Sequence, residues 1–187
     1  MNAFVTIHDA VFSQVERAGR WLLPLAARLV FASTLLLYFW NSGLTKLGDG
    51  LLGLFSPSIG AYSQIFPKQL EAAGYDVSQF GLLQKLVVLA GTYAEFILPL
   101  LIVLGLATRL AALGMIGFVV VQSLTDVIGH GATDAKTLGA MFDRFPDAVI
   151  LDQRLFWLFL LAYLVVRGGG ALSVDALLRR RVAAVPS

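Results

Sequence analysis

The chain has 187 residues, of which 58% are hydrophobic and 14% are charged, and its formal net charge is +2. Soluble domains are about 45–50% apolar and about 25% charged, so this composition is typical of a membrane protein, and the small charge suggests no nucleic-acid partner. The absence of cysteine excludes disulfides, thiolate metal sites and thiol relays within the chain.

The first twenty residues place apolar side chains at helical spacing between polar ones, at Phe4, Ile7, Val11 and Val15. This pattern predicts a short amphipathic helix that lies in the membrane interface. A frayed N-terminal tail is the alternative, because chain ends are often disordered. Of the two, the helix fits the spacing better.

Four apolar stretches are long enough, or nearly so, to cross a bilayer as helices. A helix rises about 1.5 Å per residue and the hydrocarbon core is about 30 Å thick, so about twenty residues are required. The last stretch is the weakest, because Asp152, Gln153 and Arg154 fall within its first turns. The predicted spans cover residues 21–41, 83–108, 110–129 and 148–167.

These spans predict an all-α fold, a polytopic four-transmembrane-helix bundle that forms one membrane domain over residues 1–187. The outer loops at 48–81 and 130–147 are expected to carry short interfacial helices, because both contain spaced apolar residues. The second and third spans are close enough in sequence to form a tight antiparallel hairpin. A basic tail at 168–187 follows the glycines that end the fourth span.

The basic residues predict the orientation of the bundle. With four spans both chain ends lie on one side, and that side holds eight basic residues against six on the other. The eight also lie closer to the spans. The positive-inside rule therefore predicts a multi-pass protein with both termini in the cytoplasm.

The second span carries a carboxylate, Glu95, near its middle. An unpaired carboxylate in the hydrocarbon is costly, so Glu95 requires a partner or a proton. Arg28, two turns into the first span, is the expected counter-ion, because its long side chain can approach Glu95 from the nearer surface. Two interpretations remain open: Glu95 is the floor of a polar pocket or proton path, or its hydrogen bonds simply lock the bundle.

Further polar residues are expected between Glu95 and the outer surface. Gln122 lies at about the same depth in the third span, and Asp126 and His130 follow it on one face of an α-helix. Asn41 and Lys46, at the outer end of the first span, are expected at the height of these two. For Asp126 and His130 an interfacial position without function is favoured, since polar residues cost little there. Two histidines without cysteine match no metal or catalytic motif, so neither kind of site is predicted.

Three stretches together resemble the DoxX family: Arg28 followed by WNSGLTKL at 40–47, GTYAEFILPLLIVLGLATRLAALG at 91–114, and RGGGALSVDALL at 167–178. The resemblance implies a compact four-helix bundle in the bacterial inner (cytoplasmic) membrane, linked to thiosulfate:quinone oxidoreduction or to redox-protective complexes. Arg28, Lys46 and Glu95 fall where the family carries its basic and acidic membrane residues. Thiol-redox members of the wider superfamily use cysteines, which this chain lacks.

The resemblance leads to the hypothesis of an accessory or quinone-linked subunit of a redox system, which is not catalytic alone. Quinone is the one cofactor suggested, and the chain is expected to hold no metal or thiol centre. The expected partners are the lipid bilayer and other membrane or redox proteins, or further copies of the chain. Two alternatives stay open: a small proton or solute carrier or channel that uses Gln122, Asp126 and His130, and a structural subunit that binds a larger membrane complex through 48–81.

Overall fold

The computed structural model describes residues 2–183 and is all-helical, with no strand among those residues. Four helical runs are long and apolar enough to cross a membrane: Ala3–Lys46, Leu82–Leu104, Thr108–Gly129 and Val149–Arg167. The predicted four-span all-α membrane fold is therefore confirmed, the weak fourth span included. Residues 184–187 of the predicted basic tail lie outside the described part of the chain.

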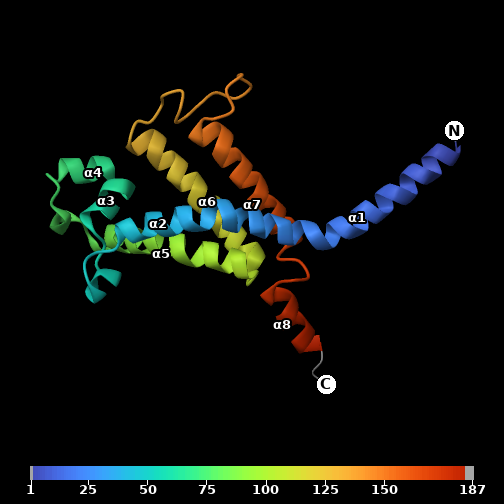
Figure 1. Cartoon of the computed structure of the whole chain (residues 1–187). Helices are drawn as coiled ribbons and strands as arrows, with labels where there is room; N and C mark the ends of the chain where they lie inside the picture. Colours follow the sequence, from blue (N-terminus) through green and yellow to red (C-terminus); the bar gives the residue numbers. More distant parts are fainter. Residues whose placement is uncertain (1, 184–187) are drawn as a thin grey trace.

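The order of the helices along the chain can be followed in Figure 1. The first run consists of α1 (Asn2–Phe31), the π-helical turn η1 (Ala32–Leu36) and α2 (Leu37–Lys46). The next connection carries η2 (Leu51–Leu54), α3 (Ile59–Ile65), α4 (Pro67–Ala72) and η3 (Val77–Gln79). The remaining elements are α5 (Leu82–Leu104), α6 (Thr108–Leu124), the π-helical turn η4 (Thr125–Gly129), the π-helical segment η5 (Val149–Arg154), α7 (Leu155–Arg167) and α8 (Val174–Ala183).

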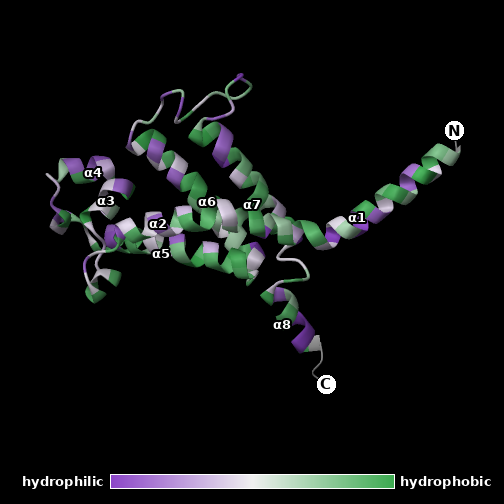
Figure 2. Cartoon of the chain, in the orientation of Figure 1, coloured by the Kyte–Doolittle hydropathy of each residue, from purple (hydrophilic) through white to green (hydrophobic). Residues whose placement is uncertain are grey.

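The first helical run is much longer than a bilayer is thick. Its 44 residues correspond to about 66 Å, about twice the hydrocarbon core. Residues 3–18 are exposed and project away from the bundle, with hydrophobic and hydrophilic positions alternating along them (Figures 1 and 2). The prediction of a separate interfacial helix is therefore wrong, because α1 contains Pro24 without a break and continues into the first span.

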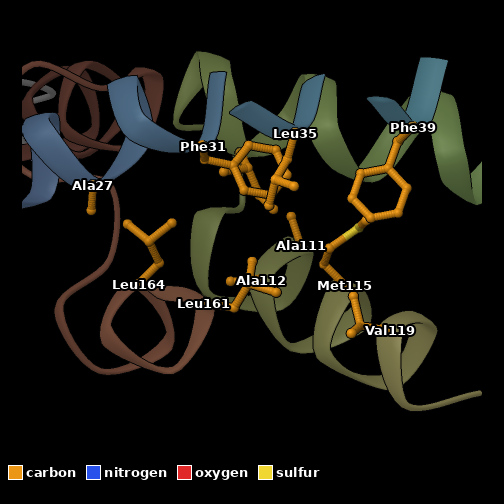
Figure 3. Close-up of a cluster of buried hydrophobic side chains, with 11 residues drawn as sticks. Ala27, Phe31, Leu35, Phe39, Ala111, Ala112, Met115, Val119, Leu161 and Leu164 are labelled. Carbon is orange, nitrogen blue, oxygen red and sulfur yellow. The ribbon is translucent and has the colours of Figure 1, made fainter. Parts of the chain in front are cut away.

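The main core forms along one face of the first helical run (Figure 3). Its buried residues recur every four positions, which places them on the same side of the helix. They are Ala27, Phe31, Leu35 and Phe39, and they meet Ala111, Ala112, Met115 and Val119 of α6 and Leu161 and Leu164 of α7. Since lipid is as apolar as these side chains, they stabilise the bundle mainly through close van der Waals packing.

The connection between α2 and α5 folds into a cap, which we define as residues 47–81. A small second core joins the cap to α5 and consists of Ala61, Tyr62, Leu70, Phe80 and Val88. The short helices expected in this connection are present as α3 and α4. The loop at 130–147, by contrast, contains turns and no helix, so the expectation of an interfacial helix there is wrong.

The turn between α5 and α6 consists of residues 105–107 only. Gly105 ends α5 at φ +70°, in the left-handed region, and a Cβ there would lie 2.8 Å from the guanidinium carbon of Arg28. Both the conformation and the close approach of Arg28 therefore require glycine at this position. The predicted tight hairpin of the second and third spans is confirmed.

Candidate functional site

The buried carboxylate of Glu95 binds the ammonium group of Lys46. Lys46 Nζ lies 3.0 Å from both carboxylate oxygens, and the two residues are only 4% and 2% exposed. The hydroxyl of Ser42 donates to Glu95 Oε1 at 3.0 Å and accepts from Lys46 Nζ at 2.7 Å. We call these three residues the buried triad. Each of its charged groups has partners within the chain.

The geometry of α2 brings the triad together. Ser42 and Lys46 are four residues apart, about one helical turn, so both face α5. Between them Gly43 packs on the ring of Phe96, where a Cβ would lie 2.7 Å from two ring carbons. Trp40 Nε1 also donates to the Phe96 carbonyl at 3.2 Å. Because Gly43 has no side chain and Trp40 forms this hydrogen bond, α2 and α5 approach closely enough for the triad to form.

The cap covers the triad at the C-terminal end of α2. Ser58 N–H donates to the Lys46 carbonyl and its hydroxyl donates to the Thr45 carbonyl, both at 3.0 Å. The hydroxyl of Tyr93, on α5, donates to the Leu54 carbonyl at 2.6 Å and fixes the cap to this helix. The ion pair is therefore enclosed by protein on the side where α2 ends.

Arg28 is not the counter-ion of Glu95, and the structure corrects this expectation. Its guanidinium donates four hydrogen bonds of 2.5–3.1 Å to the backbone carbonyls of Ile102, Val103, Gly169 and Leu172. Ile102 lies seven residues beyond Glu95 on α5, or about 10 Å along the helix. Arg28 precedes Lys46 by 18 residues on one continuous helical run, or about 27 Å, so only Lys46 stands level with Glu95.

The polar residues expected as a ladder on α6 have three different partners. Gln122 Nε2 donates to the hydroxyl of Tyr38 at 3.1 Å. Asp126 forms an ion pair with Arg154, with 2.7 Å between Oδ2 and Nη2, and His130 Nε2 lies 3.2 Å from a backbone carbonyl of α3. The π-helical turn η4 explains the separation, because its wider turn shifts positions spaced by four away from a common face. The continuous ladder is not formed.

Of the seven candidate residues, the structure joins only Lys46 and Glu95 directly. Asn41 is exposed on α2, and Arg28 lies near the opposite end of α5. Within residues 2–183 no group of three or more His, Asp or Glu side chains is arranged to hold a metal ion. A functional role for any of these residues stays a prediction.

A family model decides the relationship of this chain to known proteins. The DoxX model matches residues 23–131, more than half of the sequence. The chain belongs to the DoxX family. No curated protein and no solved structure matches it. The DoxX match covers the first span from residue 23 onward, the second and third spans and all seven candidate residues, whereas the fourth span lies beyond it.

Arg154 was predicted only as part of the fourth span and not as a site residue, and it lies beyond the DoxX match. It is 4% exposed, and it donates from Nη1 to the hydroxyl of Ser123 at 3.0 Å in addition to pairing with Asp126. Its Nε is buried and has no hydrogen-bond partner among the described residues. The sequence signal that could have identified it is an arginine in the first turn of the fourth span at the same height in the membrane as Asp126 in the third span.

A second missed residue, Asp175, joins α8 to the DoxX-matched hairpin. Its carboxylate accepts the N–H of Ala107 at 2.7 Å and both the N–H and the hydroxyl of Thr108 at 2.9 and 2.7 Å, which caps the start of α6. Its own N–H donates to the Gly105 carbonyl at 2.9 Å. Burial raises the pKa of Asp175, but these hydrogen bonds and the charge of Arg179 outweigh it and hold the pKa below its ordinary value.

Arg28 and Asp175 act on the same turn of the DoxX bundle from two sides. The carbonyls at the end of α5 carry the negative end of the helix dipole, which the guanidinium of Arg28 satisfies. The N–H groups at the start of α6 carry the positive end, which the carboxylate of Asp175 satisfies. We call Arg28, Asp175 and the turn at 105–107 the clasp. It fastens the α5–α6 turn to the connection between α7 and α8.

Proposed function

We propose that this multi-pass membrane protein is an accessory, quinone-linked subunit of a redox system in the bacterial inner membrane. The observation that supports it is a hollow of about 220 Å³ beside the Asp126–Arg154 pair. Its polar lining residues are Ser123 and Arg154, and its apolar lining includes Val120, Leu124, Met141, Leu151 and Leu158.

The chemistry of this lining suits a quinone ring, which is flat, apolar and carries carbonyl acceptors. The apolar walls match the faces of the ring, and Arg154 supplies N–H groups at one side of the hollow. A carbonyl oxygen placed there accepts a hydrogen bond from the guanidinium of Arg154. Asp126, held by the same guanidinium, places a carboxylate next to the site. When bound, a quinone supplies an acceptor for electrons and protons.

Access to the hollow is from the bilayer, where quinones dissolve. Val120, Leu124 and Leu155 line it and are exposed on the surface of the span helices. Because the chain has no cysteine, we assign the supply of electrons to a partner protein, and the subunit itself to holding the quinone. This division of roles is why we propose an accessory subunit rather than a complete oxidoreductase.

We also propose that both termini are cytoplasmic. Three of the basic residues, Arg28, Lys46 and Arg154, are buried inside the bundle. Among the exposed basic residues, seven lie on the side of the termini and four on the opposite side. The bias of exposed positive charge is therefore larger than the bias of the whole sequence, which favours this orientation.

Quinone binding is expected to fail when the Asp126–Arg154 pair is removed. The double variant Asp126→Asn/Arg154→Gln eliminates both charges together, so neither is left buried without a partner. The detergent-purified protein is titrated with a short-chain ubiquinone or menaquinone, and quenching of tryptophan fluorescence reports binding. The variant is expected to bind about tenfold more weakly, since a hydrogen bond to a charged donor is lost.

The matched control is Asp134→Asn/Lys136→Gln, which removes the same two charge types from exposed positions in the 130–147 loop. Its affinity for quinone is expected to equal that of the parent protein. A second variant, Val120→Phe, fills the hollow and keeps both charges, and it is expected to weaken binding as well. Unchanged affinity in both the double variant and Val120→Phe would exclude this site.

A structural role in a larger membrane complex is the second candidate function. The tip of the cap at η2 exposes three large apolar side chains, Leu51, Leu52 and Phe55, at 87%, 81% and 75%. Replacing all three by serine is expected to release partner proteins that are purified with the tagged chain from native membranes. Retention of the same partners by the triple variant would count against this candidate, while quinone affinity serves as the check that the variant is folded.

A further inference from the structure

A groove separates the projecting part of α1 from the end of α7. Its volume is about 770 Å³, and its apolar walls are formed by Val15 and Leu23 of α1 and by Phe159 and Val166 of α7. Below the groove α1 contacts the connection that follows α7, where Pro24 packs against Gly170, whose added Cβ would lie 2.7 Å from the proline ring. Beyond this contact α1 leaves the bundle (Figure 1). The groove lies in the space between the diverging α1 and α7. Gly19 widens it, because this residue of the α1 wall has no side chain.

Two arginines line this groove at the same boundary of the membrane. Arg167 is the last residue of α7, the fourth span, and Arg20 directly precedes the apolar part of the first span. Both are exposed, and neither is in an ion pair with any residue in the range 2–183. Glu16 also lines the groove, so the lining carries two positive charges and one negative charge.

Tyr163 of α7 lies below the two arginines. Tyr163 lines the groove, and its hydroxyl is buried and has no hydrogen-bond partner in the described chain. Tyr163 precedes Arg167 by four residues, so it lies about one helical turn deeper along α7. The groove thus offers positive charge at the membrane surface and apolar walls beside and below it.

We infer that this groove holds one anionic phospholipid. Its phosphate lies between Arg20 and Arg167, and an acyl chain lies along Leu23 and Phe159. Basic pockets between spans at a membrane surface suit anionic headgroups. The apolar walls distinguish a lipid from free phosphate, because a free anion gains nothing from them. The site is separate from the quinone hollow, so the two proposals stand or fall independently.

Native mass spectrometry of the full-length protein in mild detergent tests the inference. The protein is incubated with equal amounts of phosphatidylglycerol and phosphatidylcholine that carry the same acyl chains. The parent is expected to retain one phosphatidylglycerol in preference to phosphatidylcholine. The variant Arg20→Gln/Arg167→Gln is expected to bind phosphatidylglycerol about tenfold more weakly, because two basic contacts to the headgroup are lost.

The control Arg180→Gln/Arg181→Gln removes the same charge from exposed positions of α8 and is expected to retain the lipid. A third variant, Ala162→Trp, fills the groove, keeps both arginines and is expected to lose the lipid. Three results would overturn the inference: equal loss in both arginine double variants, equal retention of the two lipids by the parent, or displacement of phosphatidylglycerol by excess inorganic phosphate.

Discussion

Glu95→Gln is expected to destabilise the protein by about 3–5 kcal/mol, because it leaves the Lys46 ammonium buried without its counter-ion. Lys46→Met is expected to have an effect of the same size, since it leaves the carboxylate buried instead. The measurement is the midpoint of thermal unfolding of the protein in detergent, which is expected to fall by roughly 10 °C in either single variant.

The double variant Lys46→Met/Glu95→Gln distinguishes the interaction energy of the pair from the separate effects of the two residues. It is expected to recover most of the lost stability, because replacing a buried ion pair by uncharged groups is often nearly neutral. The control Lys68→Met/Glu71→Gln alters the same residue types at exposed positions of α4 and is expected to change stability by less than about 0.5 kcal/mol. Additive losses in the buried double variant would show that the two residues do not act as a pair.

The same double variant decides between the two interpretations of Glu95. A stable double variant that still supports the redox activity of its partner would assign the pair to holding α2 against α5. A stable double variant without that activity would assign Glu95 to proton transfer. Because stability and activity are measured on one protein, loss of the fold cannot be mistaken for loss of function.

Arg28→Gln is expected to cost about 3 kcal/mol or more, because four carbonyls lose a charged donor. Arg28→Lys is expected to restore less than half of this loss, since an ammonium lacks the planar fork that reaches both the end of α5 and the connection between α7 and α8. Arg17→Gln, at an exposed position of the same helix, is the control and is expected to leave stability unchanged.

A local measurement distinguishes this effect from general loss of stability. The chain has no cysteine, so Ala171→Cys introduces a single label site in the connection that Arg28 holds. Labelling by a maleimide is expected to become about tenfold faster when Arg28→Gln is added, because the connection opens locally. It is expected to stay unchanged when Lys46→Met/Glu95→Gln is added. Equal acceleration in both backgrounds would contradict a role for Arg28 in the clasp.

The four spans could be predicted because apolarity and length are local properties of a sequence. The same is true of the tight hairpin, which follows from the few residues around Gly105. The separate N-terminal helix was wrong because the amphipathic pattern predicts which face is apolar, not where a helix bends. Two residues between Arg17 and Leu25 disfavour a helix, Gly19 and Pro24, yet α1 continues through both, with Pro24 packed against Gly170.

The pairing inside the bundle could not be predicted, because it depends on the relative heights of helices that are far apart in sequence. The cap lets α5 extend past the end of α2, so Lys46 meets the middle of α5. The π-helical turn η4 then moves Asp126 toward Arg154. Residue type identified Lys46, Glu95 and Asp126 as candidates, but a one-dimensional pattern contains no information about these offsets.

The clasp has a consequence for the order in which this protein is made. Two of the carbonyls that bind Arg28 belong to Gly169 and Leu172, which are synthesised 141 and 144 residues after it. The first span therefore enters the membrane early and finishes packing last. A nascent chain that stops before residue 169 has the buried triad but leaves the guanidinium half satisfied. An unfinished chain therefore differs from a complete one already at its first span, in the hydrogen bonds of Arg28.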